Sequence, residues 1–310
     1  MSLNVKDIVK KAGEAGLAVP AFNIPYLPMM EPVIQALVDE DAFGLVEVAR
    51  PEWVKFEAVG PAAVAEEFAK WQKVDFVRLH LDHIPVIDED NFRVDYLPII
   101  QEAIELGYHS VMIDGSRLDL DANIEATRQV TEVAHQAGIP CEAELGAVLG
   151  HEAGPLPPYE ELFASGRGFT DIEEARRFVE ETRCDWLSVA VGSVHGAISG
   201  VQKNEKKVEA RLDIEHLRQL RSATGIPLVL HGGSGVQRSY LLEAIKNGMT
   251  KVNIGTEIRQ AYEQAWRKTN NVRDAQQACY ERTGWLLRDY FDLSGTRSTI
   301  TRPVSKDKTS

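Results

Sequence analysis

Short apolar runs alternate with helix-like segments along this chain, and the alternation limits the folds that it can adopt. The clearest run is Leu228–Leu230, which is followed by His231 and a glycine-rich turn at residues 232–235. A helical pattern at residues 239–247 comes next. A short, unbroken apolar run is typical of a strand that is buried on both faces, as in a parallel sheet. This layout predicts a site at the carboxyl end of the strand.

The same order recurs eight times. We expect strands at residues 17–22, 44–48, 76–81, 110–113, 140–144, 186–191, 228–230 and 250–254. We expect helices at residues 30–38, 60–72, 95–106, 120–137, 213–222 and 239–247, another after Thr170 and Asp171, and more as far as about residue 291. Residues 5–15 form an amphipathic pattern that could plug one end of a barrel. Eight strand–helix rounds without a linker predict an α/β fold, a (β/α)8 TIM barrel.

The domain organisation follows from the same pattern. We expect one TIM-barrel domain over residues 1–310, with a helical extension at 257–293 and a polar tail at 294–310. A doubly wound open sheet is the structural alternative. It is weakly supported, because no predicted strand is followed by the G-x-G-x-x-G turn of dinucleotide-binding folds.

Composition excludes several classes of function. The net charge of −13 argues against binding to nucleic acid or to anionic membranes, which requires clustered Lys and Arg. No apolar run approaches the roughly 20 residues of a membrane helix, and the first residues lack the apolar core of a signal peptide. The three cysteines have no metal-type spacing, which favours reduced thiols and a cytoplasmic protein. An anionic small substrate is still compatible, given local positive potential.

Polar side chains gather where the predicted strands end, which is where barrel enzymes carry their active sites. The strand starts have no comparable cluster. The residues at the strand ends are Asn23, Arg50, Asp82, His83, Asp114, Glu144, His195, His231 and Asn253.

Three of these residues suggest a metal centre. His83, His195 and His231 follow strands three, six and seven, and three imidazoles at one mouth match a catalytic zinc site. The alternative for any one of them is a hydrogen-bonded structural histidine. By strand alternation Asp82 should point away from His83, as a general acid/base or as a carboxylate that orients a histidine. Asp114 and Glu144 are candidates for the same supporting role or for a second metal position.

Two further features lie at the same end of the predicted barrel. A long segment rich in Gly and Pro follows Glu144, and such loops often act as lids; Glu152 is its best-placed acidic residue, although it could be a solvated loop residue. The turns after strands seven and eight suit a phosphate or are tight turns without a ligand. Their candidate residues are Gly232, Gly233, Ser234, Gly235, Asn253, Gly255 and Thr256.

With these residues in view, the chain resembles the class II, zinc-dependent ketose-bisphosphate aldolases of the fructose- and tagatose-bisphosphate type. The matching motifs keep family order and run from residues 21–23 to about residue 257. They are His80-Leu81-Asp82-His83, residues 110–116, Glu142-Ala143-Glu144-Leu145-Gly146, residues 189–196, residues 231–235 and Lys251-Val252-Asn253-Ile254.

The resemblance implies an activity and a set of roles. The protein would cleave a phosphorylated ketose reversibly to dihydroxyacetone phosphate and an aldehyde. His83, His195 and His231 would ligate Zn²⁺, which would stabilise the enediolate as a Lewis acid. Asp82 would exchange a proton with the C4 oxygen, and Glu152 would move the proton on the enediolate carbon. Phosphate contacts would come from Gly196, Gly232, Ser234, Asn253 and Thr256. A monovalent cation, Na⁺ or K⁺, would accompany the phosphate, and the protein would be a homodimer or homotetramer.

Several positions depart from the family pattern and leave the substrate open. Ala49 stands where the family usually has Ser, Arg50 follows it, Ile84 replaces a Gly, and the lysine expected after His195 is displaced. One alternative is therefore an aldolase of the same mechanism that acts on a monophosphate, a deoxy sugar acid phosphate or an unphosphorylated ketose. Another is a non-catalytic protein that binds metal or sugar phosphate. A Schiff-base aldolase is disfavoured, because Lys251 begins its strand and is expected on the wrong face.

Overall fold

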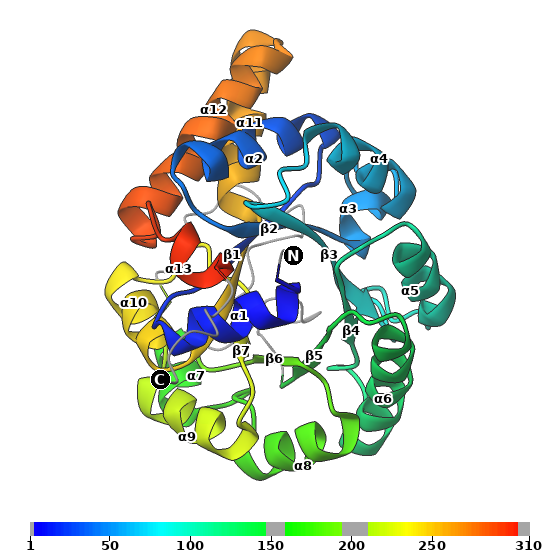
Figure 1. Cartoon of the computed structure of the whole chain (residues 1–310). Helices are drawn as coiled ribbons and strands as arrows, with labels where there is room; N and C mark the ends of the chain where they lie inside the picture. Colours follow the sequence, from blue (N-terminus) through cyan, green and yellow to red (C-terminus); the bar gives the residue numbers. More distant parts are fainter. Residues whose placement is uncertain (1–2, 147–158, 194–209, 303–310) are drawn as a thin grey trace, which may run out of the picture.

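The computed structural model describes residues 3–146, 159–193 and 210–302. Its strands form a closed barrel in sequence order, in which each strand pairs in parallel with the next and the first pairs with the last. This confirms the predicted TIM barrel (Figure 1). The strands are β1 (Val19–Asn23), β2 (Gly44–Ala49), β3 (Val77–Pro85), β4 (Ser110–Asp114), β5 (Cys141–Leu145), β6 (Trp186–Val189), β7 (Leu228–Leu230) and β8 (Met249–Ile254).

Helices surround the barrel as an outer ring, and α11 and α12 project beyond it side by side (Figure 1). The helices are α1 (Val5–Glu14), α2 (Met30–Asp39), α3 (Arg50–Val54), α4 (Pro61–Trp71), α5 (Tyr96–Glu105), α6 (Leu120–Gln136), α7 (Tyr159–Ser165), α8 (Ile172–Thr182), α9 (Ile214–Thr224), α10 (Arg238–Lys246), α11 (Thr256–Thr269), α12 (Val272–Trp285) and α13 (Arg297–Thr301). Two short non-α turns are η1 (Leu27–Met29) and the π-helical η2 (Leu286–Tyr290).

Local sequence signals explain where several helices begin and end. The side chains of Asp119, Asp171 and Asp213 accept hydrogen bonds from backbone N–H groups in the first turns of α6, α8 and α9. Such side chains satisfy donors that the helix itself leaves unpaired. Gly107 follows α5 with a φ of +83°, a conformation that suits glycine. These signals place the helices between the strands and so fix the β/α alternation.

The structure differs from the sequence expectation at several elements. The third strand extends to Pro85, so Asp82 and His83 lie within β3 and do not follow it. The sixth strand ends at Val189, two residues early. Three short helices, α3, α7 and α13, lie in segments where we expected no helix, and α13 lies within the predicted polar tail. Their few residues are too short to produce a clear helical period.

The amino-terminal helix closes one end of the barrel, as its pattern predicted. It lies across the barrel opening in Figure 1. Its apolar face, with Ile8 and Val9 buried, packs against the interior residues Leu45 and Trp186 and against Ile300 of α13. The larger apolar core lies elsewhere, between the outer face of the strands and the surrounding helices. The closed end is therefore filled with apolar side chains, and the chemistry is confined to the other end.

Alternate residues of each strand point into the barrel, and their character changes along its axis. At the closed end they are apolar. The next layer of inward-facing side chains toward the open end is charged and fully buried, and it includes Glu47, Glu142 and Lys251. The layer after that, two residues nearer the carboxyl ends of the strands, contains Asp82 and Asn253. Within the described residues, no helix combines the length and the apolar character needed to span a bilayer.

Candidate active site

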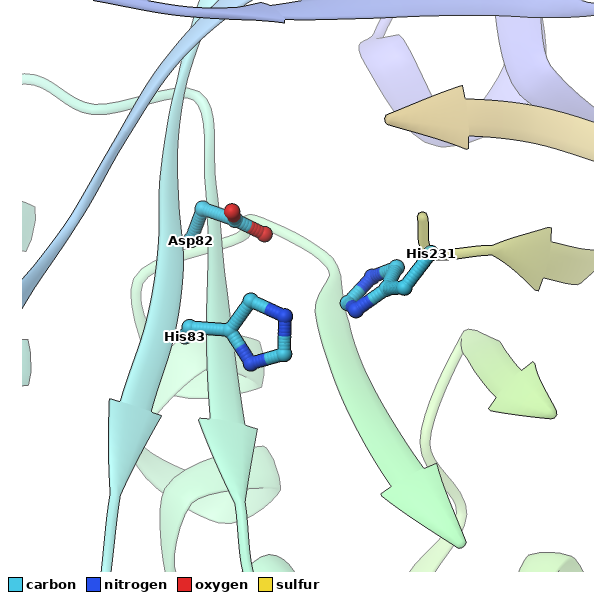
Figure 2. A group of neighbouring side chains, drawn as sticks. All are labelled: Asp82, His83 and His231. Carbon is cyan, nitrogen blue, oxygen red and sulfur yellow. The ribbon is translucent and has the colours of Figure 1, made fainter. Parts of the chain in front are cut away.

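Asp82 and His83 of β3 and His231, which directly follows β7, converge at the open end of the barrel (Figure 2). One potential ligand atom from each lies within 4.8 Å of the other two. The two imidazole rings lie edge to face, with centroids 4.3 Å apart. Asp82 and His231 are each only 1 % exposed. These three side chains therefore lie together at one end of the barrel.

Asp82 and His83 point to the same place because β3 is irregular at this point. Its pairing with β4 shifts between Leu81 and Ile84, and His83 has a φ of +37°. A bulge of this kind interrupts the side-to-side alternation of a strand. The expectation that Asp82 points away from His83 is therefore wrong. An adjacent carboxylate and imidazole can act on one bound molecule.

Carboxylates surround both histidines. The Nδ1 atom of His83 lies 3.2 Å from Asp114 Oδ2 and 3.8 Å from Glu144 Oε2. In His231, Nε2 lies 2.9 Å from Glu142 Oε1 and Nδ1 lies 3.1 Å from Glu144 Oε2. Asp114 therefore contacts His83, and Glu144 lies close to both histidines; their supporting role stays a prediction. His83, Asp114 and Glu144 also form a second group with mutual ligand-atom distances within 4.8 Å.

These acidic neighbours give the histidines a high affinity for positive charge. Burial lowers the pKa of each imidazole, but the surrounding carboxylates outweigh it and raise the pKa of His83 to about 9 and that of His231 to about 10. The donor set of imidazole nitrogens and carboxylate oxygens is one that Zn²⁺ prefers. The described residues therefore fit a divalent metal at this position, because the metal would replace the protons that the carboxylates attract.

The Asp82 carboxylate is held by two asparagines. Asn23 Nδ2 donates to its Oδ2 at 3.1 Å, and Asn253 Nδ2 donates to its Oδ1 at 3.0 Å. Burial raises the pKa of Asp82, but the charges of His83, Lys251 and the other nearby cations outweigh it and lower the pKa below its ordinary value. Asp82 is therefore ionised and aimed at the mouth. It can accept a proton from a bound hydroxyl group.

A second buried group lies deeper in the barrel. Glu47, His80 and Asp82 also bring ligand-type atoms within 4.8 Å of one another. Here the chain supplies the positive charge itself, because the fully buried Lys251 Nζ lies 3.2 Å from Glu47 Oε2 and 2.9 Å from Glu142 Oε2. The neighbouring carboxylates overcome the effect of burial and raise the pKa of Lys251 above its ordinary value. A protonated amine is not a nucleophile, which argues against a Schiff base at Lys251.

The two predicted phosphate turns begin side by side. They follow β7 and β8, which are paired through Leu230 and Val252. Gly232 has a φ of +70°, and a Cβ on Gly233 would lie 2.5 Å from Val252 Cγ1. Ser234 is buried, Gly255 precedes α11, and Thr256 is the first residue of α11. The turns are therefore tight and backbone-rich, as phosphate cradles are, and one of them leads into a helix N-terminus.

Arg50 lies at the same end, as the first residue of α3. Its Nη1 atom lies 3.1 Å from Asp88 Oδ2. Glu52, which the sequence analysis did not single out, is buried beside it and accepts a hydrogen bond from the Ala49 N–H at 2.7 Å. Burial raises the pKa of Glu52 to about 8. Near neutral pH it is therefore largely protonated and adds no full charge to the mouth.

Some predicted site residues cannot be placed. Glu152, His195 and Gly196 lie outside the described residues. Conversely, the sequence analysis missed the interior roles of Glu142 and Lys251. The available signal was the two-residue spacing, since residues two apart in a strand point to the same side. Glu142 is two residues before Glu144, and Lys251 is two residues before Asn253, so each pair faces the barrel interior. Lys251 was expected at the start of its strand, on the face away from the active site. In the structure β8 begins at Met249, and the long Lys251 side chain runs inside the barrel and brings Nζ to 2.7 Å from Asn253 Oδ1.

Comparison with known proteins places the chain in a family. The family model "Fructose-bisphosphate aldolase class-II" matches residues 3–295. The chain belongs to this family. Members are aldolases, so the protein is an enzyme of the lyase class, and the resemblance inferred from the sequence motifs is confirmed.

Individual relatives of this class-II aldolase agree. A 6-phospho-5-dehydro-2-deoxy-D-gluconate aldolase from Halalkalibacterium halodurans is 33% identical over 86% of this chain and 84% of its own length. A fructose-bisphosphate aldolase from Staphylococcus epidermidis is 32% identical over 88% of this chain and 87% of its own. The crystal structure of the YdjI aldolase from Escherichia coli K12 covers 96% of this chain and 100% of its own, with 26% identity and a TM-score of 0.73.

The contact between Glu142 and His231 predicts an effect on metal binding. Replacing Glu142→Gln removes the charged acceptor of the His231 Nε2–H, so His231 should present Nδ1 less well. We expect the affinity for Zn²⁺, measured by competition with a chelating dye, to fall about 10- to 100-fold. The matched control is Glu47→Gln, which changes a carboxylate at the same depth that does not contact the histidine. Equal zinc affinities in Glu142→Gln and Glu47→Gln would contradict the role of Glu142 in orienting His231.

Proposed function

We propose that the protein is a zinc-dependent aldolase that cleaves a phosphorylated ketose reversibly to dihydroxyacetone phosphate and an aldehyde. The observation that carries the proposal is the convergence of Asp82, His83 and His231 at the open end of the barrel in a class-II aldolase. A non-catalytic binding protein would not need an ionised carboxylate held beside the metal ligands by two amides.

The proposed metal ligands are His83, His231 and His195, the last from the sequence alone. Glu144 is close enough to both described histidines to serve as an alternative ligand. Bound zinc would polarise the ketone carbonyl and so acidify the adjacent C–H bond. The surrounding carboxylates orient the imidazoles and supply the negative potential that retains a divalent cation.

Asp82 and Glu152 would divide the proton transfers. In the cleavage direction Asp82 accepts the proton of the C4 hydroxyl as the carbon–carbon bond breaks, and in condensation it returns this proton to the aldehyde oxygen. Glu152 would move the proton at the carbon next to the carbonyl. The phosphate would lie against the turns after β7 and β8, accompanied by Na⁺ or K⁺. Gly196, Gly232, Ser234, Asn253 and Thr256 are the proposed contacts.

The metal assignment can be tested by removing single ligands. His83→Ala, His195→Ala and His231→Ala should each lose zinc and aldol cleavage but keep the circular dichroism of the barrel, because the apolar core does not depend on the site. Zinc is measured by mass spectrometry of the purified protein. The matched control is His216→Ala, which changes a histidine whose Nε2 contacts the backbone oxygen of Thr170. Full zinc retention in all three site variants would overturn the assignment.

The division of proton transfers predicts a separation of two rates. Glu152→Ala should slow exchange of the dihydroxyacetone phosphate proton with deuterated water by about 10²–10⁴-fold, the usual share of a positioned general base, with zinc still bound. Asp82→Ala should spare this exchange and block carbon–carbon cleavage. Exchange is followed by NMR. Wild-type exchange in Glu152→Ala, together with slow exchange in His151→Ala, would reassign the base to His151.

We further propose that the aldehyde half of the substrate carries a carboxylate. The relative from H. halodurans is named for 6-phospho-5-dehydro-2-deoxy-D-gluconate, an acid with a phosphate at its other end. Aldol cleavage of this compound breaks the bond between carbons 3 and 4, which are the β and α carbons of the carbon-5 ketone, and would leave the carboxylate on the aldehyde product. In this chain Arg50 lies at the mouth beside Ala49, and a guanidinium suits a carboxylate. This favours the sugar acid phosphate over fructose 1,6-bisphosphate.

This substrate assignment predicts the effect of Arg50→Met. The value of kcat/KM for the sugar acid phosphate should fall about 10- to 100-fold, as expected for loss of one charge-assisted contact. The value for fructose 1,6-bisphosphate should start lower and change less. The control is Arg117→Met, an exposed arginine after β4 whose Nη1 donates to Asn91. More efficient turnover of fructose 1,6-bisphosphate than of the acid by the unmodified enzyme would contradict the assignment.

The homodimeric or homotetrameric state and the cytoplasmic location remain predictions from the sequence.

A further inference from the structure

The buried Lys251 has no role in the reaction as proposed so far, although it lies at the centre of the barrel interior. Its Nζ atom lies 2.9 Å from Glu142 Oε2, 3.2 Å from Glu47 Oε2 and 2.7 Å from Asn253 Oδ1. Two of these three partners touch the site directly. Glu142 contacts His231, and Asn253 contacts Asp82.

Stability alone gives no reason for a cation here. Transferring an ammonium and a carboxylate from water into a protein interior costs several kcal/mol for each ion, and apolar replacements of buried ion pairs are often neutral or stabilising. The closed end of the same barrel is filled with apolar residues such as Leu45, Trp186 and Val229. The Lys251 ammonium lies only one layer of inward-facing side chains nearer the open end, so its charge calls for an explanation in terms of the site.

The contact with Asn253 fixes the orientation of an amide. An ammonium group donates hydrogen bonds and accepts none, so the atom of Asn253 that faces Lys251 must be the carbonyl oxygen. The amide nitrogen is then forced to the other side, where it lies 3.0 Å from Asp82 Oδ1. A flipped amide would place N–H groups against the ammonium and an oxygen against the carboxylate, and both contacts would be repulsive.

We propose that Lys251 is a positioning residue that orients Asp82 through Asn253 and His231 through Glu142. One buried cation would thus hold the proton-transfer carboxylate and one metal ligand in register. The inference rests on the proposed aldolase function, since it concerns how the same site is held. It assigns Lys251 no contact with substrate or metal.

The test is a mutant cycle on carbon–carbon cleavage, measured as kcat at saturating substrate. Lys251→Met should lower kcat about 10- to 100-fold, the range typical of residues that orient ligands from behind. Because Lys251 acts through both Asn253 and Glu142, Lys251→Met should cost no more than about threefold further in a background that already carries Asn253→Ala and Glu142→Gln. A Lys251→Met effect of undiminished size in that background would overturn the proposal.

Two further variants keep the result interpretable. Asn253→Asp retains an oxygen for Lys251 but replaces the N–H that faces Asp82, so it should lose cleavage as severely as Asn253→Ala, even if Lys251→Met fails to fold. Wild-type kcat in Asn253→Asp would overturn the proposal. Arg78→Met removes another buried cation, which lies at the closed end of the barrel and donates through Nη1 to the backbone oxygen of Val77, and it should keep kcat within about threefold. A loss in Arg78→Met equal to that in Lys251→Met would indicate a general structural role of buried cations and would also overturn the proposal.

Zinc content and wild-type activity separate this inference from the proposed function. If the unmodified enzyme neither binds zinc nor cleaves the ketose, the aldolase proposal fails. If the unmodified enzyme is active and Lys251→Met retains both wild-type zinc affinity and wild-type kcat, only the role of Lys251 fails.

Discussion

Closure of the parallel barrel is the constraint on which the rest of the structure depends. Once the strands close, every second residue must point inward, and residues two apart in sequence lie one above the other along the axis. The pairs Glu142 with Glu144 and Lys251 with Asn253 follow this rule. A single bulge in β3 breaks the rule and turns the adjacent Asp82 and His83 to the same mouth. The site combines one regular geometry with one local exception.

Electrostatics then connect the layers of the barrel interior. The apolar plug supplied by α1 excludes water from the closed end, so the charges above it interact strongly. Glu142 is ionised between Lys251 and His231, since these cations overcome the effect of burial and hold its pKa below its ordinary value. Glu144 behaves differently, because burial and the neighbouring Asp114 raise its pKa. The interior therefore provides fixed negative charge next to the histidines, which suits a divalent cation.

The fold and the mouth were largely predictable, whereas the interior was not. Apolar runs ending in polar residues predicted the barrel and the joint position of His83 and His231, because strand ends meet at one edge. The direction of Asp82 was not predictable, since one extra residue in a strand leaves no periodic signal. The place of the Lys251 ammonium was misjudged, because the position of a residue in a strand predicts where its Cα atom lies and not where a long side chain ends. The Lys251 side chain extends along the barrel interior until its ammonium reaches Asn253. Long polar side chains inside barrels therefore have to be traced atom by atom.

The central claim is that a metal lies between His83 and His231 at the open end of the barrel. The most direct measurement is a crystal structure of the zinc-loaded protein with diffraction data collected on both sides of the zinc absorption edge. The account predicts one strong anomalous peak within bonding distance of an imidazole nitrogen of each of these two histidines. An anomalous peak elsewhere, with no density between His83 and His231 at full zinc loading, would contradict it.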